Sequence, residues 1–312
     1  MKKLLLTTAI AALSVTAAQA APTVYGKAGV KVQYQEDGDV TLDTNTTRFG
    51  LTGSEAITAN TDFVYKAEFG FDIDSDGNDG EVDFKQRDTY VGLANDQMGT
   101  VVAGRLTAID DVINFTNPSE YKDAGVLGSF DGGRLNNAMA YFSPDMDGVQ
   151  LMAMYKMTDS DDGAEDNDGD LSGSYGVGAK YEKGPLAAGI TYIKADDGAD
   201  WDDIRVSGAY DLTNNFTLSG LYQVIDFDGA DEKENAYIVA GEYDVPGSKW
   251  TVYGEYDGVT NAGGVEDADA DVYSVGGDYA FTQATKGQVF LGLTDTGDDE
   301  SVGGGVGIVH KF

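Results

Sequence analysis

The sequence has 312 residues, including 42 Gly, 18 Tyr and 13 Phe, with one His and no Cys. Its 20 Lys and Arg residues stand against 54 Asp and Glu residues, which gives a formal net charge of −34. This charge argues against a nucleic-acid partner, because phosphate binding needs clustered Lys and Arg. The absence of Cys excludes disulfides and thiol nucleophiles, and a single His excludes a zinc site built on a His pair.

The N-terminus has the pattern of a secretory signal peptide. Two lysines precede a mostly apolar run over residues 4–15, and residues 18–20 (Ala-Gln-Ala) fit the small-x-small cleavage pattern. Thr and Ser residues weaken the apolar run, which argues against a membrane-spanning helix. We therefore expect residues 1–20 to be cleaved and residues 21–312 to form one domain.

After this segment, apolar and polar residues alternate in short stretches, as in half-buried β-strands. In residues 23–35, Val24 and Val32 share one face, while Lys27 and Lys31 lie on the other. The apolar faces often begin or end in Tyr, Trp or Phe, as expected where strands cross the two interfaces of a membrane. The predicted strands are 23–36, 45–55, 61–72, 83–94, 98–105, 134–143, 148–157, 173–183, 185–195, 201–211, 215–227, 234–244, 248–258, 270–280, 286–295 and 301–312. Alternation is imperfect in several of them, including 83–94 and 134–143.

The connections between these strands alternate between two kinds. One kind is short and carries few charges, and the other is long and acidic, as in residues 72–83, 159–170 and 257–271. A transmembrane β-barrel has this pattern, with short periplasmic turns and longer outer loops. We therefore predict an all-β fold, a 16-stranded antiparallel transmembrane β-barrel.

One connection, residues 105–134, is longer than the others and separates two predicted strands. An interval of this length without strands of its own is usually functional in a compact domain. We expect it to fold inward and to narrow the barrel as a constriction loop.

Four motifs, in this order and spacing, resemble those of the general trimeric porins of the Gram-negative outer membrane. They are residues 24–27 (VYGK), residues 47–55 (TRFGLTGSE), residues 90–93 (YVGL) with 99–105 (GTVVAGR), and residues 307–312 (GIVHKF). The resemblance implies a homotrimer of sixteen-stranded barrels that lets small hydrophilic solutes and ions diffuse through. It also implies that Phe312, which ends the closing strand, is read by the barrel assembly machinery.

The resemblance further implies a ladder of basic residues on the barrel wall, facing acidic residues on the inward loop. The basic candidates are Lys27, Arg48, Arg87 and Arg134. Alternation independently places Lys27 and Arg48 towards the lumen, whereas Arg87 and Arg134 rest mainly on the resemblance. The acidic candidates are Asp110, Asp111, Glu120 and Asp123. Glu120 follows a Pro-Ser pair where the family has a Pro-Glu-aromatic segment, and the three aspartates are candidates by location. Opposite charges across a narrow wet gap create a transverse field that disfavours apolar solutes. The alternative is a structural role, in which these charges form salt bridges that fix the loop to the wall.

One acidic connection matches the opening of a calcium-binding loop. Asp72, Asp74, Asp76 and Asp83 follow the D-x-D-x-D-G spacing with an acid at the twelfth position. That twelfth residue is Asp where the EF-hand pattern has Glu, and a chain this acidic produces such strings by chance. We expect no firm cofactor, and diffuse Ca²⁺ or Mg²⁺ that bridges acidic loops to lipopolysaccharide and outer-membrane lipid.

These observations predict an outer-membrane porin, not an enzyme, with cation preference from its acidic outer loops. Three alternatives remain at this point: a substrate-specific channel on the same barrel, a calcium-binding β protein of the cell surface, and a membrane-barrel enzyme. The lack of a Ser/His pair argues against the enzyme, and the placement of most aromatics on the apolar face argues against a substrate-specific channel.

Overall fold

The computed structural model describes residues 21–36, 38–73, 84–116, 118–121, 133–157, 173–195, 200–297 and 299–312. Within these ranges the chain forms one 17-stranded sheet in which paired strands run antiparallel. The strands are β1 (Thr23–Gln35), β2 (Thr41–Thr44), β3 (Arg48–Thr58), β4 (Thr61–Gly70), β5 (Lys85–Asn95), β6 (Gly99–Thr107), β7 (Arg134–Phe142), β8 (Val149–Lys156), β9 (Tyr175–Lys183), β10 (Leu186–Ala195), β11 (Trp201–Thr213), β12 (Phe216–Phe227), β13 (Glu234–Asp244), β14 (Trp250–Thr260), β15 (Ala270–Ala280), β16 (Thr285–Asp295) and β17 (Glu300–Lys311). Two short helices, α1 (Ile109–Val112) and the 3-10 helix η2 (Ala262–Gly264), lie in connections.

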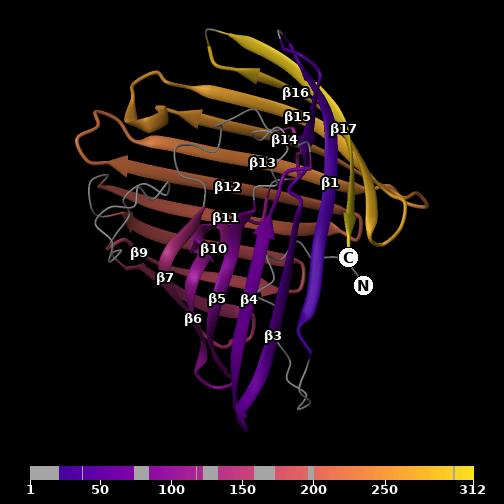
Figure 1. Ribbon diagram of the computed structural model, residues 1–312. Coiled ribbons are helices and arrows are strands. Elements are labelled where there is room, and N and C mark those ends of the chain that lie inside the picture. The colour runs from indigo at the N-terminus through magenta and orange to yellow at the C-terminus, as the bar shows by residue number, and fades with distance from the viewer. Residues whose placement is uncertain are drawn as a thin grey trace.

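The sheet closes on itself because the first and last strands pair. β17 runs antiparallel to β1, from the pair Lys27 and Lys311 to the pair Gln35 and Gly303, and the two strands lie side by side in Figure 1. Closure leaves no unpaired edge between these strands, which is a requirement for a sheet that spans a lipid bilayer.

Seventeen strands correspond to sixteen positions around the barrel. β2 and β3 both pair with β1, one after the other, so together they fill a single position. The interruption lies at residues 45–47, where Thr46 has a positive φ of 47°. The predicted sixteen-stranded barrel is confirmed. β2 lies outside the predicted strands, because four residues are too few to establish an alternating pattern.

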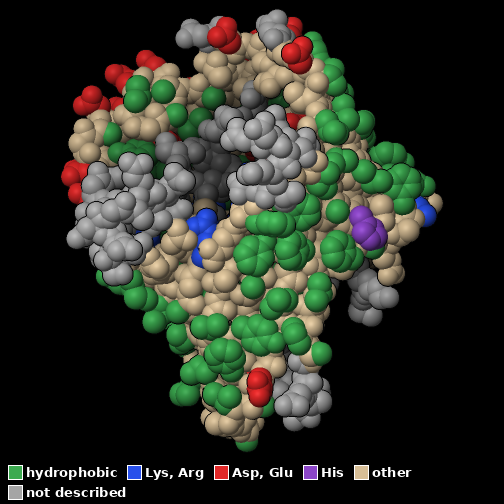
Figure 2. Space-filling model, in the orientation of Figure 1, with side chains coloured by type: hydrophobic (Ala, Val, Ile, Leu, Met, Phe, Trp, Pro, Cys, Tyr) green, Lys and Arg blue, Asp and Glu red, His purple; other side chains and the backbone are tan. Residues whose placement is uncertain are grey.

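The outward face of the wall is apolar. Exposed large apolar side chains alternate along the strands, as with Val91 and Leu93 on β5 and Val302, Val306 and Ile308 on β17. Figure 2 shows apolar side chains spread over the outer wall and Asp and Glu side chains gathered mainly along one rim. No helix within the described ranges is long and apolar enough to cross a membrane.

Imperfect alternation in β7 has a structural cause. In β7 the inward Ala138, Ala140 and Phe142 are buried, so both faces of this strand are apolar. These residues join a core cluster with Ile109 and Ile113 from the connection after β6. The folded-in segment covers this part of the inner wall, and this explains why the inward side chains of β7 are apolar.

Candidate pore constriction

The connection between β6 and β7 begins with a segment packed against the inner wall. Ile109 and Ile113 are almost completely buried in the core cluster, and burial of each is worth roughly 1.5–3 kcal/mol. Helix α1 has four residues and cannot be stable in isolation, so this packing is what holds it. The wall makes room for both side chains at two glycines: a Cβ added to Gly176 would lie 2.8 Å from Ile109, and one added to Gly189 would lie 2.5 Å from Ile113.

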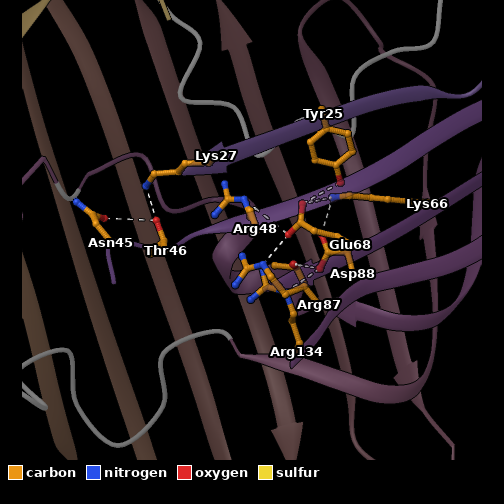
Figure 3. Close-up of polar contacts among 11 residues, drawn as sticks. Tyr25, Lys27, Asn45, Thr46, Arg48, Lys66, Glu68, Arg87, Asp88 and Arg134 are labelled. Atoms are coloured by element: carbon orange, nitrogen blue, oxygen red, sulfur yellow. Dashed lines mark hydrogen bonds and ion pairs between the residues drawn. The ribbon is translucent and has the colours of Figure 1, made fainter. Parts of the chain in front are cut away.

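Three of the four predicted basic residues meet on the inner wall formed by β3, β5 and β7. Figure 3 shows Arg48 from β3, Arg87 from β5 and Arg134 from β7 with their guanidinium groups gathered around two acids. Glu68 on β4 accepts from Arg87 Nε at 2.5 Å and lies 3.8 Å from Arg48 Nε. Asp88 on β5 lies 2.9 Å from Arg134 Nε.

Two further side chains complete this cluster, which we call the charged wall. Lys66 Nζ lies 2.8 Å from Asp88 and 3.7 Å from Glu68. The hydroxyl of Tyr25 donates to Glu68 at 2.8 Å. The charged wall thus consists of Tyr25, Arg48, Lys66, Glu68, Arg87, Asp88 and Arg134.

A β-bulge explains why two neighbouring residues both take part. The pairing of β4 with β5 shifts register between Ala67 and Phe69, so that Arg87 and Asp88 both lie opposite Glu68. A bulge turns consecutive side chains towards one face, which strict alternation forbids. This is why alternation alone did not place Arg87.

Lys27 lies beside the charged wall but has a different partner. Its Nζ donates to Thr46 Oγ1, at the interruption between β2 and β3 (Figure 3). The interruption also directs Asn45 inward, where its amide donates to Glu120 at 3.2 Å and to Gln288 at 2.9 Å.

Glu120 lies inside the barrel, and its partners come from strands other than those that carry the wall arginines. Its carboxylate accepts from the amide of Gln288 on β16 and lies 3.8 Å from Lys286 Nζ. Its backbone N–H donates to Tyr253 on β14 at 3.3 Å. Among the described residues, the hydrogen bonds and ion pairs of Glu120 connect it to Asn45, Tyr253, Lys286 and Gln288 and not to Arg48, Arg87 or Arg134. The resemblance implied acids on the loop that face the basic wall across a gap. The ion-pair partners of the wall arginines in the structure are Glu68 and Asp88, which lie on the wall itself.

Asp110 differs from its predicted role. Its side chain is fully buried between α1 and the barrel wall. Its carboxylate lies 3.2 Å from Nη1 of Arg205, whose side chain is fully buried as well. Arg205 Nε also donates to Gln223 at 2.6 Å. Asp110 therefore does not line an aqueous gap in this structure. It had been grouped with the loop acids by location, and a location in the chain does not reveal which side of a loop meets the wall.

The remaining acidic candidates are less defined. Asp111 is partly exposed in α1, and its carbonyl accepts from the Asn114 N–H at 3.2 Å. Asp123 lies outside the described residues, as do Asp74, Asp76 and Asp83 of the calcium pattern. Asp72 is paired with Lys85 at 2.7 Å. The described part of the chain contains no cluster of three or more His, Cys, Asp or Glu residues suited to a metal ion.

Sequence reasoning missed Glu68 and Asp88 as site residues. Glu68 does lie on the polar side of its strand together with Lys66, so alternation carried a signal for it. Asp88 gave no such signal, because it depends on the bulge.

The chain is similar in sequence to known outer-membrane proteins. The family model for Gram-negative porins matches residues 6–299. The Escherichia coli outer membrane protein YedS is 26% identical over 204 residues, which cover 57% of this chain and 56% of that protein. The match thus spans little more than half the length of this curated relative.

Solved structures share the fold at low identity. An anion-selective porin from Comamonas acidovorans has a TM-score of 0.74 at 22% identity, covering 94% of this chain and 99% of that one. OmpF from Salmonella typhi, in complex with daunomycin, has a TM-score of 0.75 at 18% identity over 93% and 97%. The trimer form of OmpT from Vibrio cholerae has a TM-score of 0.72 at 18% identity over 94% and 99%. The family match confirms the resemblance drawn from the four motifs.

Proposed function

Because the chain belongs to the Gram-negative porin family of the outer membrane, whose members are channels and not enzymes, we propose that it forms a water-filled pore. The pore passes small hydrophilic solutes and ions by passive diffusion. The observation that supports this is a closed barrel with partly exposed charged side chains inside it: Arg48 keeps 32% of its side chain exposed and Arg87 keeps 25%. Solvated charges along a lumen favour hydrophilic solutes and penalise apolar ones.

We further propose a preference for cations. The formal charge of −34 is the support, together with the acidic rim visible in Figure 2. Negative potential at a channel mouth concentrates cations before they reach the narrow part.

Anion preference is the second candidate, and a specific observation favours it. Arg48, Lys66, Arg87 and Arg134 outnumber Glu68 and Asp88 on the charged wall, so this wall carries a positive excess. The Comamonas acidovorans porin, which shares the fold, is anion-selective.

The test is the reversal potential of purified protein in a planar bilayer under a KCl gradient. A cation-selective potential that weakens when Glu120, Asp111 and Asp123 are neutralised supports the proposal and places its filter at the loop. An anion-selective potential that disappears in an Arg48→Gln, Arg87→Gln, Arg134→Gln triple variant supports the second candidate. Absence of conductance from folded protein overturns both.

The proposal extends to processing and partners. Residues 1–20 are removed as a signal peptide, and the mature chain assembles as a homotrimer, as the trimer form of OmpT does. The acidic outer loops bind Ca²⁺ or Mg²⁺ diffusely and so bridge to lipopolysaccharide phosphates and outer-membrane lipid. Phe312 is the residue that the barrel assembly machinery reads. Mass spectrometry of the mature N-terminus and the mobility of unheated protein in detergent gels test the first two statements.

A further inference from the structure

Residues 118–121 carry the inward connection to the side of the barrel opposite α1. There Tyr121 turns into the wall, with 7% of its surface exposed, and packs with Val272 and Phe290. Its hydroxyl lies 3.3 Å from Thr294 Oγ1. These partners come from β15 and β16, so residues 118–121 have an attachment site of their own.

Two glycines form the seat of the Tyr121 ring. A methyl group on Gly292 of β16 would overlap the ring, and one on Gly303 of β17 would lie 2.8 Å from Tyr121 Cε2. Gly292 and Gly303 are paired across the two strands, so their missing side chains form one continuous depression. A flat ring over two adjacent glycines fixes its own position closely, because packed interiors tolerate little displacement.

Glu120 precedes Tyr121 and turns the other way. While the ring faces the wall, the carboxylate of Glu120 meets Asn45, Gln288 and Lys286 in the lumen. Because Glu120 and Tyr121 are consecutive and contact different groups, the position of the Tyr121 ring limits where the Glu120 carboxylate can reach. A second bond supports this arrangement, since Ser119 Oγ accepts from the Tyr121 N–H at 3.1 Å.

The opposite end of the connection is fixed separately. Ile109 and Ile113 belong to the large core cluster, whereas Tyr121 belongs to a different one. Loss of the ring therefore leaves α1 in place, while residues 118–121 keep only their polar attachments, such as the Ser119 N–H to Glu255 and the Glu120 N–H to Tyr253.

We propose that Tyr121 is a positioning residue that holds Glu120 at the constriction and thereby sets ion selectivity. This inference rests on the proposed channel function. Tyr121 acts through Glu120 and through the depression at Gly292 and Gly303, and not through contact with the permeating ion.

The experiment compares reversal potentials of five variants and one control, Ile113→Ala, with that of wild-type protein. The variants are Glu120→Gln, Tyr121→Ala, Tyr121→Phe, Gly292→Ala and the double variant Glu120→Gln, Tyr121→Ala. Heat-modifiable mobility in detergent gels establishes that each is folded. We expect Tyr121→Ala to shift the potential in the direction of Glu120→Gln and by at least half as much. In the Glu120→Gln background the same change should add no further shift, because residues that act as one unit are not additive. Tyr121→Phe keeps the ring and should behave as wild type.

Gly292→Ala keeps the proposal testable if Tyr121→Ala fails to fold. It displaces the ring from the wall side and should produce the same shift. Ile113→Ala is the matched control, because it removes an apolar anchor at α1 and should lower stability without a shift in potential.

Three results overturn the inference in a conducting wild type. They are an unchanged potential in both Tyr121→Ala and Gly292→Ala, an equal shift from Ile113→Ala, and a full additional shift in the double variant. A wild type that does not conduct overturns the proposed function itself, and this inference with it.

Discussion

Glu68 is the residue on which the charged wall depends. Its two oxygens serve Arg87, Arg48, Lys66 and the hydroxyl of Tyr25, and its side chain keeps 5% of its surface exposed. The negative charge of Glu68 offsets the electrostatic repulsion among Arg48, Lys66 and Arg87. Without it, like charges would face one another in a partly dry setting.

Glu68→Gln should therefore shift selectivity towards anions. The change removes a negative charge and leaves the basic groups of the wall in place, and it should also lower the free energy of unfolding by about 1–3 kcal/mol. Reversal potential and denaturant titration measure the two effects. Glu55→Gln, at an exposed position on β3, removes the same charge elsewhere and should do neither. A shift towards cations would show that Glu68 is not the neutralising group.

The pair Asp110 and Arg205 has a structural role of a different kind. Both side chains are fully buried, 3.2 Å apart, between the inward segment and β11. Removal of one member of a buried pair leaves the other charge uncompensated, which typically costs about 3–5 kcal/mol.

Asp110→Asn should lower the unfolding free energy by roughly that 3–5 kcal/mol, while Asp111→Asn, at the partly exposed neighbour, should change it by less than about 0.5 kcal/mol. Urea unfolding in detergent micelles measures both. Equal effects from the two variants would contradict the conclusion that Asp110 is buried against Arg205 rather than exposed to the aqueous gap.

At the scale of elements, the strands were predictable and the docking of the inward connection was not. Alternation is a local pattern, so it marked β1, β4 and β12–β17 within a few residues of their observed ends. The bulge opposite Glu68 and the break at Thr46 depend on how each strand pairs with its neighbour in the sheet. A local alternating pattern does not encode this pairing. The same holds for Tyr121, whose ring packs over Gly292 and Gly303 in distant strands.

The glycines under α1 also belong to this scale. Gly189 on β10 leaves the space that Ile113 occupies, and a Cβ there would approach it to 2.5 Å. Helix α1 is held by this fit and by the neighbouring core, because four residues supply little helical stability.

Gly189→Val should therefore loosen the root of the connection. Overpacking of a filled site costs typically about 1–3 kcal/mol, and we expect excess noise in the open-channel current as α1 loses its fixed position. Gly133→Ala, where a Cβ would meet nothing within 4 Å, is the matched control and should leave stability and noise unchanged. A quiet, fully stable Gly189→Val channel would show that α1 does not need this seat.

For the whole molecule, two charge systems compete for the passing ion. The chain carries a formal charge of −34, whereas the charged wall has a local positive excess at the level of Arg48 and Arg87. The rim charges are solvated and act over distance, whereas the groups of the wall lie inside the barrel and are partly buried. Salt screens the first kind strongly and the second kind much less.

Selectivity measured at rising ionic strength should separate the two systems. The Debye length falls from about 30 Å at 0.01 M to about 3 Å at 1 M salt, so a cation preference set by the rim should decline steeply across this range. A preference set at the constriction by Glu120 should persist, because an ion in the gap is closer than the screening length. The measurement is a series of reversal potentials at a fixed concentration ratio, with Glu120→Gln in parallel. If wild type and variant decline together, the rim sets the selectivity. If selectivity persists at 1 M in the wild type and is lost in Glu120→Gln, the constriction sets it. A sign reversal to anion preference at high salt would identify the wall arginines as the inner filter beneath an acidic mouth.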